Sequence, residues 1–486
     1  MTNLKSKILF ASSEVYPLIK TGGLADVSQA LPHALGELKQ DVRIIMPAYR
    51  ALNKLVKQSK LIASKSFLED EVNLYENTFP ESDLIVWLVD CPPLFDREGG
   101  PYQDKNDKTW GDNAQRFALF SRVITAIAAN NMQLGWYPDI LHCNDWQTGL
   151  APALLQYEKT RPKIVFTIHN LAYQGVFPLS ICSELQLPSE LASFESMEFY
   201  NQFSFIKGGI LYADQVTTVS PTYAKEIQTE MYGAGLNALL KLHSNKLSGI
   251  INGINVDEWN PENDKFISTV YNSKTLGLKT ENKTALQKEL NLVCDEYIPL
   301  FATVSRLVSQ KGIDLIIEVL PQLAKLNLQV VVLGKGDEQL EAALLKAVNN
   351  NPDKISARIG YDEALAHKIT AAADFFMMPS RFEPCGLNQM YSQRYGTIPI
   401  VHKTGGLADT VIDDAKDDVQ ITANSGIVFE QVNSAQLLHA ILRGLSIFKN
   451  KEFREQMQVN GMKQNFSWTN SALQYIDLYS KILSKV

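Results

Sequence analysis

The sequence has few cysteines and no long apolar run. Its five cysteines (91, 143, 182, 294 and 385) are scattered over 486 residues without a Cys-x-x-Cys pair. An odd number at wide spacing predicts free thiols in a reducing compartment rather than a disulfide framework. No stretch approaches the roughly 18 apolar residues of a membrane span, and the short apolar run at 8–12 has no cleavage site after it. We therefore expect a soluble, cytoplasmic protein.

The sequence also lacks a strong charge of either sign. It has 46 basic and 53 acidic residues, a net charge of -7, which offers no general attraction to nucleic acid or to an anionic membrane. Any anion-binding site must therefore be local. The G-x-G-x-x-G and Walker patterns are missing, which disfavours nicotinamide and P-loop chemistry. Neither an Asp-x-Asp pair nor a histidine cluster with metal-ligand spacing occurs, so we expect no metal and no cofactor.

Apolar strand-like runs alternate with helical patterns in two successive sets. The first set has strands at 7–12, 42–47, 140–142, 163–167 and 215–220. A stretch rich in Gly, Asn, Asp and Pro at 252–261 then marks a hinge. The second set has strands at 300–304, 329–333, 355–359, 374–378 and 397–401 and helices at 311–326, 337–349, 362–373 and 386–395.

This alternation predicts an α/β protein with two Rossmann-like, doubly wound domains that face a cleft between them. We place the first domain at 1–255 and the second at 256–469. The final helix, at about 471–485, lies in a segment (470–486) that we expect to return to the first domain.

A seven-residue repeat stands out. Lys20–Asp26 reads Lys-Thr-Gly-Gly-Leu-Ala-Asp, and Lys403–Asp409 has the same sequence. In the first copy, Gly22 and Gly23 permit positive φ and a close backbone approach, and the following helix directs N–H groups and its positive dipole end to the loop. With Lys20 as counter-charge, this predicts a phosphate site. A shared structural turn remains the alternative.

Two loops of the second domain carry further polar candidates. Arg306 and Lys311 follow strand 300–304, at the strand end where α/β sheets bind ligands, and could neutralise a departing diphosphate. Solvated loop cations are the alternative. In the loop at 380–387, Glu383 could accept sugar hydroxyl groups, and the helix start could bind an anion through the backbone of the last two loop residues. Cys385 is either reactive or a small packing residue.

The first domain adds Asp145 and His169, each just beyond an apolar strand. Asp145 could orient an acceptor hydroxyl or act as a base, and His169 could line a sugar pocket. Tyr102 and Trp146 offer flat faces for sugar rings, with ordinary aromatic burial as the alternative.

Through Lys20–Val27, Arg306–Gly312 and Arg381–Leu387, the chain resembles the family of bacterial glycogen synthases and plant starch synthases. The likeness runs nearly end to end, and its further landmarks are Asp112-Asn113, Asn252-Gly253 and Phe466-Ser467-Trp468. The resemblance implies a GT-B fold. It also implies transfer of glucose from ADP-glucose to the non-reducing 4-OH of an α-1,4-glucan such as glycogen, with retention of configuration.

The resemblance also implies roles for single residues. Donor diphosphate would meet Lys20, Gly22, Gly23, Arg306 and Lys311. Glucose and phosphate would be held by Glu383, Cys385, Gly386 and Leu387. His169 and Asn252 would contact glucose, Asp145 would lie at the reacting face, and Tyr361 would lie near adenine.

The chain departs from the family pattern at three points. It has Asn144 and Gln147 where histidines are commoner, and Asn388 where threonine is often found. Many retaining relatives carry a second glutamate where this chain, like its family, has Tyr391. A paired-carboxylate mechanism is therefore not supported, and we favour a front-side route over double displacement.

The sequence disfavours two other functions. A non-catalytic glucan- or nucleotide-binding protein would not need the diphosphate cations. Another retaining GT-B enzyme, of the sucrose- or trehalose-synthase type, is set aside by the Lys-Thr-Gly-Gly-Leu loop. The choice of adenine over uracil rests on the resemblance alone.

Overall fold

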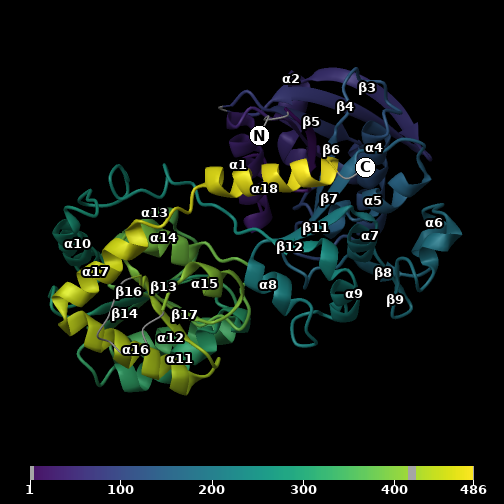
Figure 1. Cartoon of the computed structure of the whole chain (residues 1–486). Helices are drawn as coiled ribbons and strands as arrows, with labels where there is room; N and C mark the ends of the chain where they lie inside the picture. Colours follow the sequence, from purple (N-terminus) through teal and green to yellow (C-terminus); the bar gives the residue numbers. More distant parts are fainter. Residues whose placement is uncertain (1–4, 81, 414–422, 485–486) are drawn as a thin grey trace. The chain divides into compact units, whose positions relative to one another are not determined.

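The computed structural model describes residues 5–80, 82–413 and 423–484. The chain divides into two compact units, each built on its own mainly parallel sheet (Figure 1). Unit 1 comprises residues up to 219, 224–253 and 468 onward, and unit 2 comprises 220–223 and 254–467. Apart from the four residues 220–223, the chain passes between the units at 253/254 and 467/468, two residues before the predicted boundaries at 255/256 and 469/470. The predicted α/β fold with two Rossmann-like sheets is confirmed.

The cysteines and the helices bear on two further expectations, free thiols and no membrane span. All five cysteines lie in the described part of the chain, and all are free thiols. None of the helices within the described ranges is long and apolar enough to cross a membrane.

Unit 1 contains a nine-stranded sheet in the order β12-β11-β7-β6-β1-β2-β5-β4-β3. Its strands are β1 (Lys7–Ala11), β2 (Asp41–Pro47), β3 (Lys60–Phe67), β4 (Asp70–Thr78), β5 (Ile85–Asp90), β6 (Ile140–Asn144), β7 (Lys163–Ile168), β11 (Gln215–Thr218) and β12 (Leu247–Gly249). All neighbours pair in parallel except β3 with β4 and β4 with β5. β3, β4, β5, β12 and the later β18 (Ile427–Phe429) were not predicted. β3 and β4 are partly exposed and lack the continuous apolar runs of buried parallel strands, and β12 and β18 have only three residues each. β5 is a buried apolar run that the sequence analysis overlooked.

A small antiparallel sheet and several helices complete this half. The sheet consists of β8 (Val176–Pro178), β9 (Glu198–Phe199) and β10 (Gln202–Ser204). The helices between the strands are α1 (Gly23–Glu37), α2 (Asn53–Gln58), α3 (Pro92–Phe95), α4 (Asn113–Ala128), α5 (Leu150–Leu154), α6 (Ile181–Glu184), α7 (Phe205–Tyr212), α8 (Pro221–Glu226) and α9 (Asn237–Leu242).

The strand order of unit 1 reverses at β1. β1 lies between β2, which follows it in sequence, and β6, which comes much later. The loops that leave the carboxyl ends of β1 and β6 therefore diverge around a topological switch point, where open α/β sheets bind ligands.

The last helix, α18 (Trp468–Leu483), belongs to unit 1 and packs beside α1 (Figure 1). Its buried residues Ala472, Tyr475, Tyr479 and Ile482 recur at helical spacing and join the core that contains β1. Tyr479 also lies in hydrogen-bond contact with buried His142 on β6, with 2.8 Å between its hydroxyl and Nδ1. The predicted return of the chain terminus thus has a polar anchor as well as an apolar face.

His142 makes the protein sensitive to acid. Burial lowers its pKa to about 3, whereas an unfolded chain would protonate it near pH 6.5. Stability should therefore be lost as the pH falls below about 6.5, by about 2 kcal/mol at pH 5 from this group alone. In urea unfolding, the parent should have a lower free energy of unfolding at pH 5 than at pH 7.5. We expect His142→Gln to make this difference smaller by about 2 kcal/mol. An unchanged difference would contradict this assignment.

Unit 2 contains a six-stranded parallel sheet in the order β15-β14-β13-β16-β17-β18. Its strands are β13 (Leu300–Val304), β14 (Gln329–Gly334), β15 (Ile355–Ile359), β16 (Phe375–Met378), β17 (Ile398–His402) and β18 (Ile427–Phe429). Its helices are α10 (Lys279–Glu289), α11 (Ile313–Leu323), α12 (Glu338–Asn350), α13 (Glu363–Ala372), α14 (Asn388–Arg394), α15 (Gly405–Thr410), α16 (Ser434–Lys449) and α17 (Lys451–Met462).

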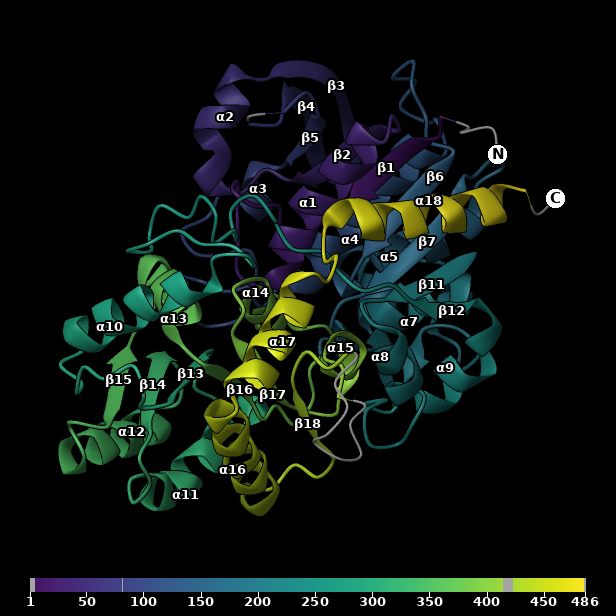
Figure 2. The same cartoon turned by 60° about the vertical axis from the view of Figure 1, so that its left-hand side comes forward.

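Helices cover both faces of this sheet (Figure 2). Along β14, Val330 and Val332 join the core under α11, α12 and α16, while Val331 and Leu333 join the core under α10 and α13. Burial on both faces explains why these strands are recognisable as apolar runs. The order reverses at β13, which lies between β14 and β16, so the loops after β13 and β16 leave a second switch point.

Candidate active site

The candidate residues form two groups, one at the switch point of each unit. In unit 1 they lie on the loops after β1, β6 and β7, and in unit 2 on the loops after β13 and β16.

Glu14 organises the glycine loop of unit 1 and was missed by the sequence analysis. This carboxylate is 3% exposed and accepts hydrogen bonds from Thr21 N at 2.5 Å, Thr21 Oγ1 at 2.6 Å and Gly22 N at 3.3 Å. Tyr102 donates its hydroxyl hydrogen to it at 2.6 Å. The first N–H groups of the loop are thus directed at a protein carboxylate, and a bound phosphate would be left mainly the N–H groups at the start of α1.

Lys20 is exposed at the mouth of this loop. Its ammonium group lies 2.7 Å from Asp26 in the first turn of α1 and 5.3 Å from the ring centre of Tyr16. An exposed ion pair of this kind is weak. Lys20 could therefore leave Asp26 and pair with a phosphate with little loss of free energy.

The two copies of the repeat differ in structure. Neither Gly22 nor Gly23 has a positive φ, so the conformation that these glycines permit is not used, and a Cβ at either position would meet nothing within 4 Å. In the second copy Gly405 has φ +43, and its Cβ would overlap the carbonyl oxygen of Glu383. The second pair of glycines is therefore a packing surface under the Glu383 loop. The first pair has no such structural requirement.

This contrast gives a test that separates structure from ligand approach. Gly22→Ala should leave the unfolding free energy unchanged or raised by about 0.5 kcal/mol, while Gly405→Ala should lower it by about 2 kcal/mol or more. If the Gly22 backbone approaches phosphate, Gly22→Ala should nevertheless raise KM for the nucleotide sugar several-fold. Urea unfolding and steady-state kinetics on both variants measure this. An unchanged KM would make the first copy a plain turn.

Asp145 is held in a strained and buried position after β6. Its φ of 55° and ψ of -179° lie near a region that glycine alone enters freely, at a cost of about 1–3 kcal/mol. The backbone is fixed by Asp145 N donating to Thr167 O at 2.9 Å, and Oδ1 accepts from His169 N at 2.8 Å. Burial raises the pKa of the carboxyl to about 7, against the lowering effect of backbone hydrogen bonds from His169 and Asn170. A strained carboxyl that titrates near neutrality has the properties of a functional group.

His169 is neutral, and its tautomer follows from its neighbours. Asn144 donates Nδ2–H to Ala11 O at 3.0 Å, which turns its Oδ1 toward His169 Nε2 at 2.9 Å. His169 must therefore carry its hydrogen on Nε2 and offer Nδ1 as an acceptor. Burial lowers its pKa to about 3, so it remains neutral. The asparagine that departs from the family pattern thus sets the hydrogen-bonding role of the histidine.

The aromatic candidates of unit 1 belong to a packed cluster. The ring of Trp146 lies 5.0 Å from that of Phe117 and 6.5 Å from that of Tyr102, and a Cβ on Gly175 would overlap its indole. Trp146 and Tyr102 are only partly buried within this cluster, so contact of their faces with sugar rings stays a prediction. The Tyr102 hydroxyl contributes through Glu14.

Asn252 lies beyond β12, at the edge of the sheet and away from the switch point. It is 7% exposed, and its Oδ1 has no hydrogen-bond partner among the described residues. A buried acceptor without a partner is available to a bound ligand.

Lys311 and Glu383 form the centre of the unit 2 group. Lys311 Nζ lies 2.5 Å from Glu383 Oε2, and Ser380 Oγ donates to the same oxygen at 3.2 Å. The Glu383 side chain is only 8% exposed and that of Lys311 19%. A half-buried, charge-assisted pair of this kind can orient a carboxylate toward sugar hydroxyls while keeping a cation beside a phosphate.

Arg306 is exposed on the loop after β13, and Arg381 fixes that loop to the next one. Arg381 donates to both carboxylate oxygens of Asp314, at 2.8 and 2.6 Å, and its backbone N donates to Gln310 O at 2.8 Å. In the sequence, Arg381 stood out only as the first residue of the motif Arg381–Leu387. It is a positioning residue that aligns the loops bearing Lys311 and Glu383.

The loop that carries Glu383 also holds three further candidates, Cys385, Gly386 and Leu387. Cys385 is buried, and a Cβ on Gly406 would overlap its carbonyl, so its backbone packs against the second copy of the repeat; a role for its thiol stays a prediction. Gly386 has φ +72, and α14 begins at Asn388 rather than at the predicted 386, with Leu387 as the cap. Asn388 Nδ2 donates to Val304 O at 2.6 Å, which ties α14 to the end of β13.

Tyr361 lies apart from these groups. It follows β15 at the edge of the sheet and is 86% exposed. A stacking role against adenine remains a prediction.

Two domain families match the chain, and their match regions follow its two halves. The family described as the starch synthase catalytic domain matches residues 7–242, and the glycosyl transferases group 1 family matches residues 287–464.

Individual relatives extend over the whole chain. The chain is 48% identical to glycogen synthase 1 of Methylococcus capsulatus, over 98% of this chain and 97% of that protein. It is 49% identical to a glycogen synthase of Cellvibrio japonicus, over 98% and 99%. Among solved structures, the catalytic domain of starch synthase IV from Arabidopsis thaliana bound to ADP and acarbose superposes with a TM-score of 0.86 and 33% identity, covering 99% of this chain and 100% of that one.

Proposed function

The chain belongs to the family of bacterial glycogen synthases and plant starch synthases, and we propose that it transfers glucose from ADP-glucose to the non-reducing end of an α-1,4-glucan with retention of configuration. The observation that carries the proposal is end-to-end similarity at nearly half identity, together with a cation–carboxylate pair, Lys311 and Glu383, at a switch point. The choice of ADP is supported by the starch synthase that was solved with ADP.

In the proposed reaction the bond between the anomeric carbon and the diphosphate oxygen breaks, and a bond to the acceptor 4-oxygen forms. The acceptor proton passes to the departing phosphate oxygen on the same face, which retains configuration without a second carboxylate. Negative charge grows on the phosphate, where Arg306, Lys311 and Lys20 would stabilise it. Glu383 would hold glucose hydroxyls.

Unit 1 would supply the remaining groups. Asp145 would accept or orient a hydroxyl at the reacting carbon, and the neutral acceptor Nδ1 of His169 would receive a glucose hydroxyl hydrogen. The proposal requires both groups of residues to reach one donor molecule. Exclusion of water from that complex would limit hydrolysis of the donor.

We further propose that the reaction needs no metal or cofactor, that the protein works in the cytoplasm, and that it binds neither nucleic acid nor membrane. Dialysis against a chelator should therefore leave turnover unchanged.

The test is a donor screen with a glycogen primer and radiolabelled ADP-, UDP- and GDP-glucose. We expect incorporation from ADP-glucose to exceed that from the other donors by at least about tenfold. Preference for another nucleotide would overturn the adenine assignment. If the glucan is bound but no donor is turned over, the chain is the non-catalytic binding protein considered above.

A further inference from the structure

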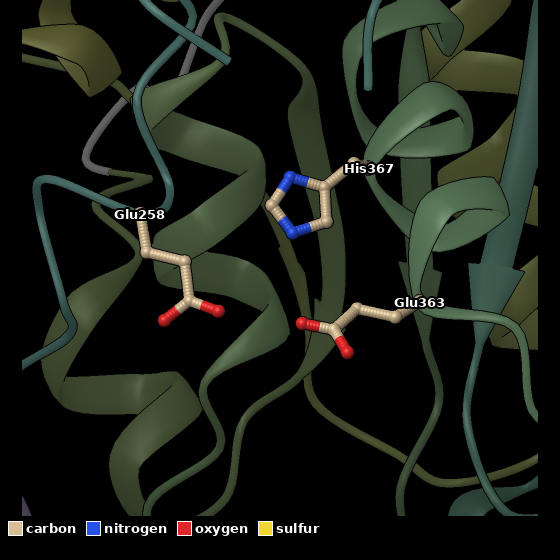
Figure 3. Close-up of side chains that lie close together, drawn as sticks. All are labelled: Glu258, Glu363 and His367. Carbon is tan, nitrogen blue, oxygen red and sulfur yellow. The ribbon is translucent and has the colours of Figure 1, made fainter. Parts of the chain in front are cut away.

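A second cluster of ligand-type side chains lies in unit 2 and does not include Lys311 or Glu383. Glu258 lies on the segment that follows the 253/254 crossing, while Glu363 and His367 lie one turn apart on α13. One potential ligand atom from each of the three lies within 4.8 Å of the others (Figure 3). Spacing of four residues puts Glu363 and His367 on the same face of their helix.

His367 is oriented as metal-binding histidines are. It is 1% exposed, and its Nδ1 lies 2.8 Å from Asp264 Oδ2, which also accepts the Tyr395 hydroxyl hydrogen at 2.6 Å. A carboxylate only accepts, so Nδ1 carries the hydrogen and Nε2 presents a lone pair. A carboxylate behind the ring fixes this tautomer and the orientation of the ring.

The free nitrogen is aimed into the cluster. His367 Nε2 has no hydrogen-bond partner among the described residues although it is buried, and it points toward the carboxylates of Glu258 and Glu363 (Figure 3). An unpaired buried acceptor is destabilising unless something binds it. Trp259 stacks on the imidazole at 3.8 Å between ring centres and holds the ring in place.

We propose that Glu258, Glu363 and His367 bind one divalent transition-metal ion of the Zn²⁺ class. Imidazole with two carboxylates suits Zn²⁺, whereas Mg²⁺ and Ca²⁺ prefer oxygen ligands throughout. Ligand atoms around tetrahedral Zn²⁺ are about 3.4 Å apart, so the carboxylates must move inward. Both are exposed and able to do so, although Glu258 Oε2 also accepts from Asn255 Nδ2 at 3.2 Å.

The ion would tie the segment 254–264 to α13. It would add a cross-link between the start of unit 2 and its sheet-covering helix, and it takes no part in the transfer reaction proposed above. The site was not visible in the sequence, because one of its ligands is distant from the other two.

The test is Zn²⁺ titration by calorimetry, after removal of metals, in a Cys294→Ser background that removes the exposed thiol. We expect one ion per chain and a rise in Tm on Zn²⁺ addition. Glu258→Gln and Glu363→Gln should each weaken binding about 10- to 100-fold and abolish the rise in Tm. Substituting Co²⁺ should give visible absorption bands that both variants lose.

Glu338→Gln is the matched control. Glu338 is exposed at the first position of α12 and follows a capping aspartate, as Glu363 does on α13. The control should bind Zn²⁺ like the parent. Equal affinity in the parent and both glutamine variants, or no binding at about 1 mM Zn²⁺, would overturn the proposal. Transfer activity measured in the same samples distinguishes failure of this site from failure of the proposed function.

Discussion

Lys311→Ala and Glu383→Ala should each lower kcat for transfer from ADP-glucose by about 100- to 1,000-fold. Loss of one preorganised group that stabilises developing charge has effects of this size. Lys311→Ala would remove the positive charge beside the departing phosphate. Glu383→Ala would remove the acceptor for glucose hydroxyls and leave the Lys311 ammonium half-buried without its partner.

The two side chains should also act as a unit. Because they pair at 2.5 Å, the double variant should lose much less activity than the product of the two single losses. Lys403→Ala is the matched control: Lys403 occupies the repeat's lysine position in the second copy, but it is exposed and paired with exposed Glu430. It should keep nearly full activity. Near-normal turnover in either test variant would rule out the assigned roles.

Asp145→Asn should remove most activity and at the same time stabilise the protein. The side chain keeps an oxygen that can accept from His169 N, so the fold should survive, but the group can no longer take up a proton or carry charge. We expect kcat to fall by about 100-fold or more, because the variant loses the negative charge that orients the hydroxyl at the reacting carbon. The low-pH arm of the wild-type rate profile, near pH 7, should disappear with it.

The stability gain follows from the direction of the pKa shift. The folded carboxyl titrates near 7 and the unfolded one near 4, so the folded state holds the proton more tightly. Wild-type stability therefore falls as the pH rises from about 4 to about 7. Asparagine escapes this loss. The variant should be more stable by about 2–4 kcal/mol at pH 8 and by nothing below pH 4 in urea unfolding. Asp477→Asn, at an exposed position on α18, should show no such gain. A pH-independent difference would refute the shift.

The fold was largely predictable because its sheets are parallel. Strands buried on both faces, such as β14, form short apolar runs between helices, and their order is constrained by short right-handed connections. β3 and β4 escaped notice because a partly exposed antiparallel hairpin carries polar residues on many positions. The start of α14 was misplaced by two residues because Gly386 takes a left-handed conformation that delays the helix.

The site was predictable where a residue type follows a strand in a recognisable motif. Lys311 and Glu383 come together as such reasoning requires. Glu14 was missed because its partners, Thr21 and Tyr102, come from separate loops, and a lone glutamate carries no pattern. Whether Asn252 and Tyr361 contact substrate stays a prediction, since both lie at sheet edges.

The position of α18 has a consequence for synthesis in the cell. Four of its buried side chains complete the core around β1, yet they are translated only after the whole of unit 2. The N-terminal half therefore waits, with an apolar face uncovered, while the whole of unit 2 is translated. Unit 2 can close its own core earlier, so the half made first should be the half that finishes folding last.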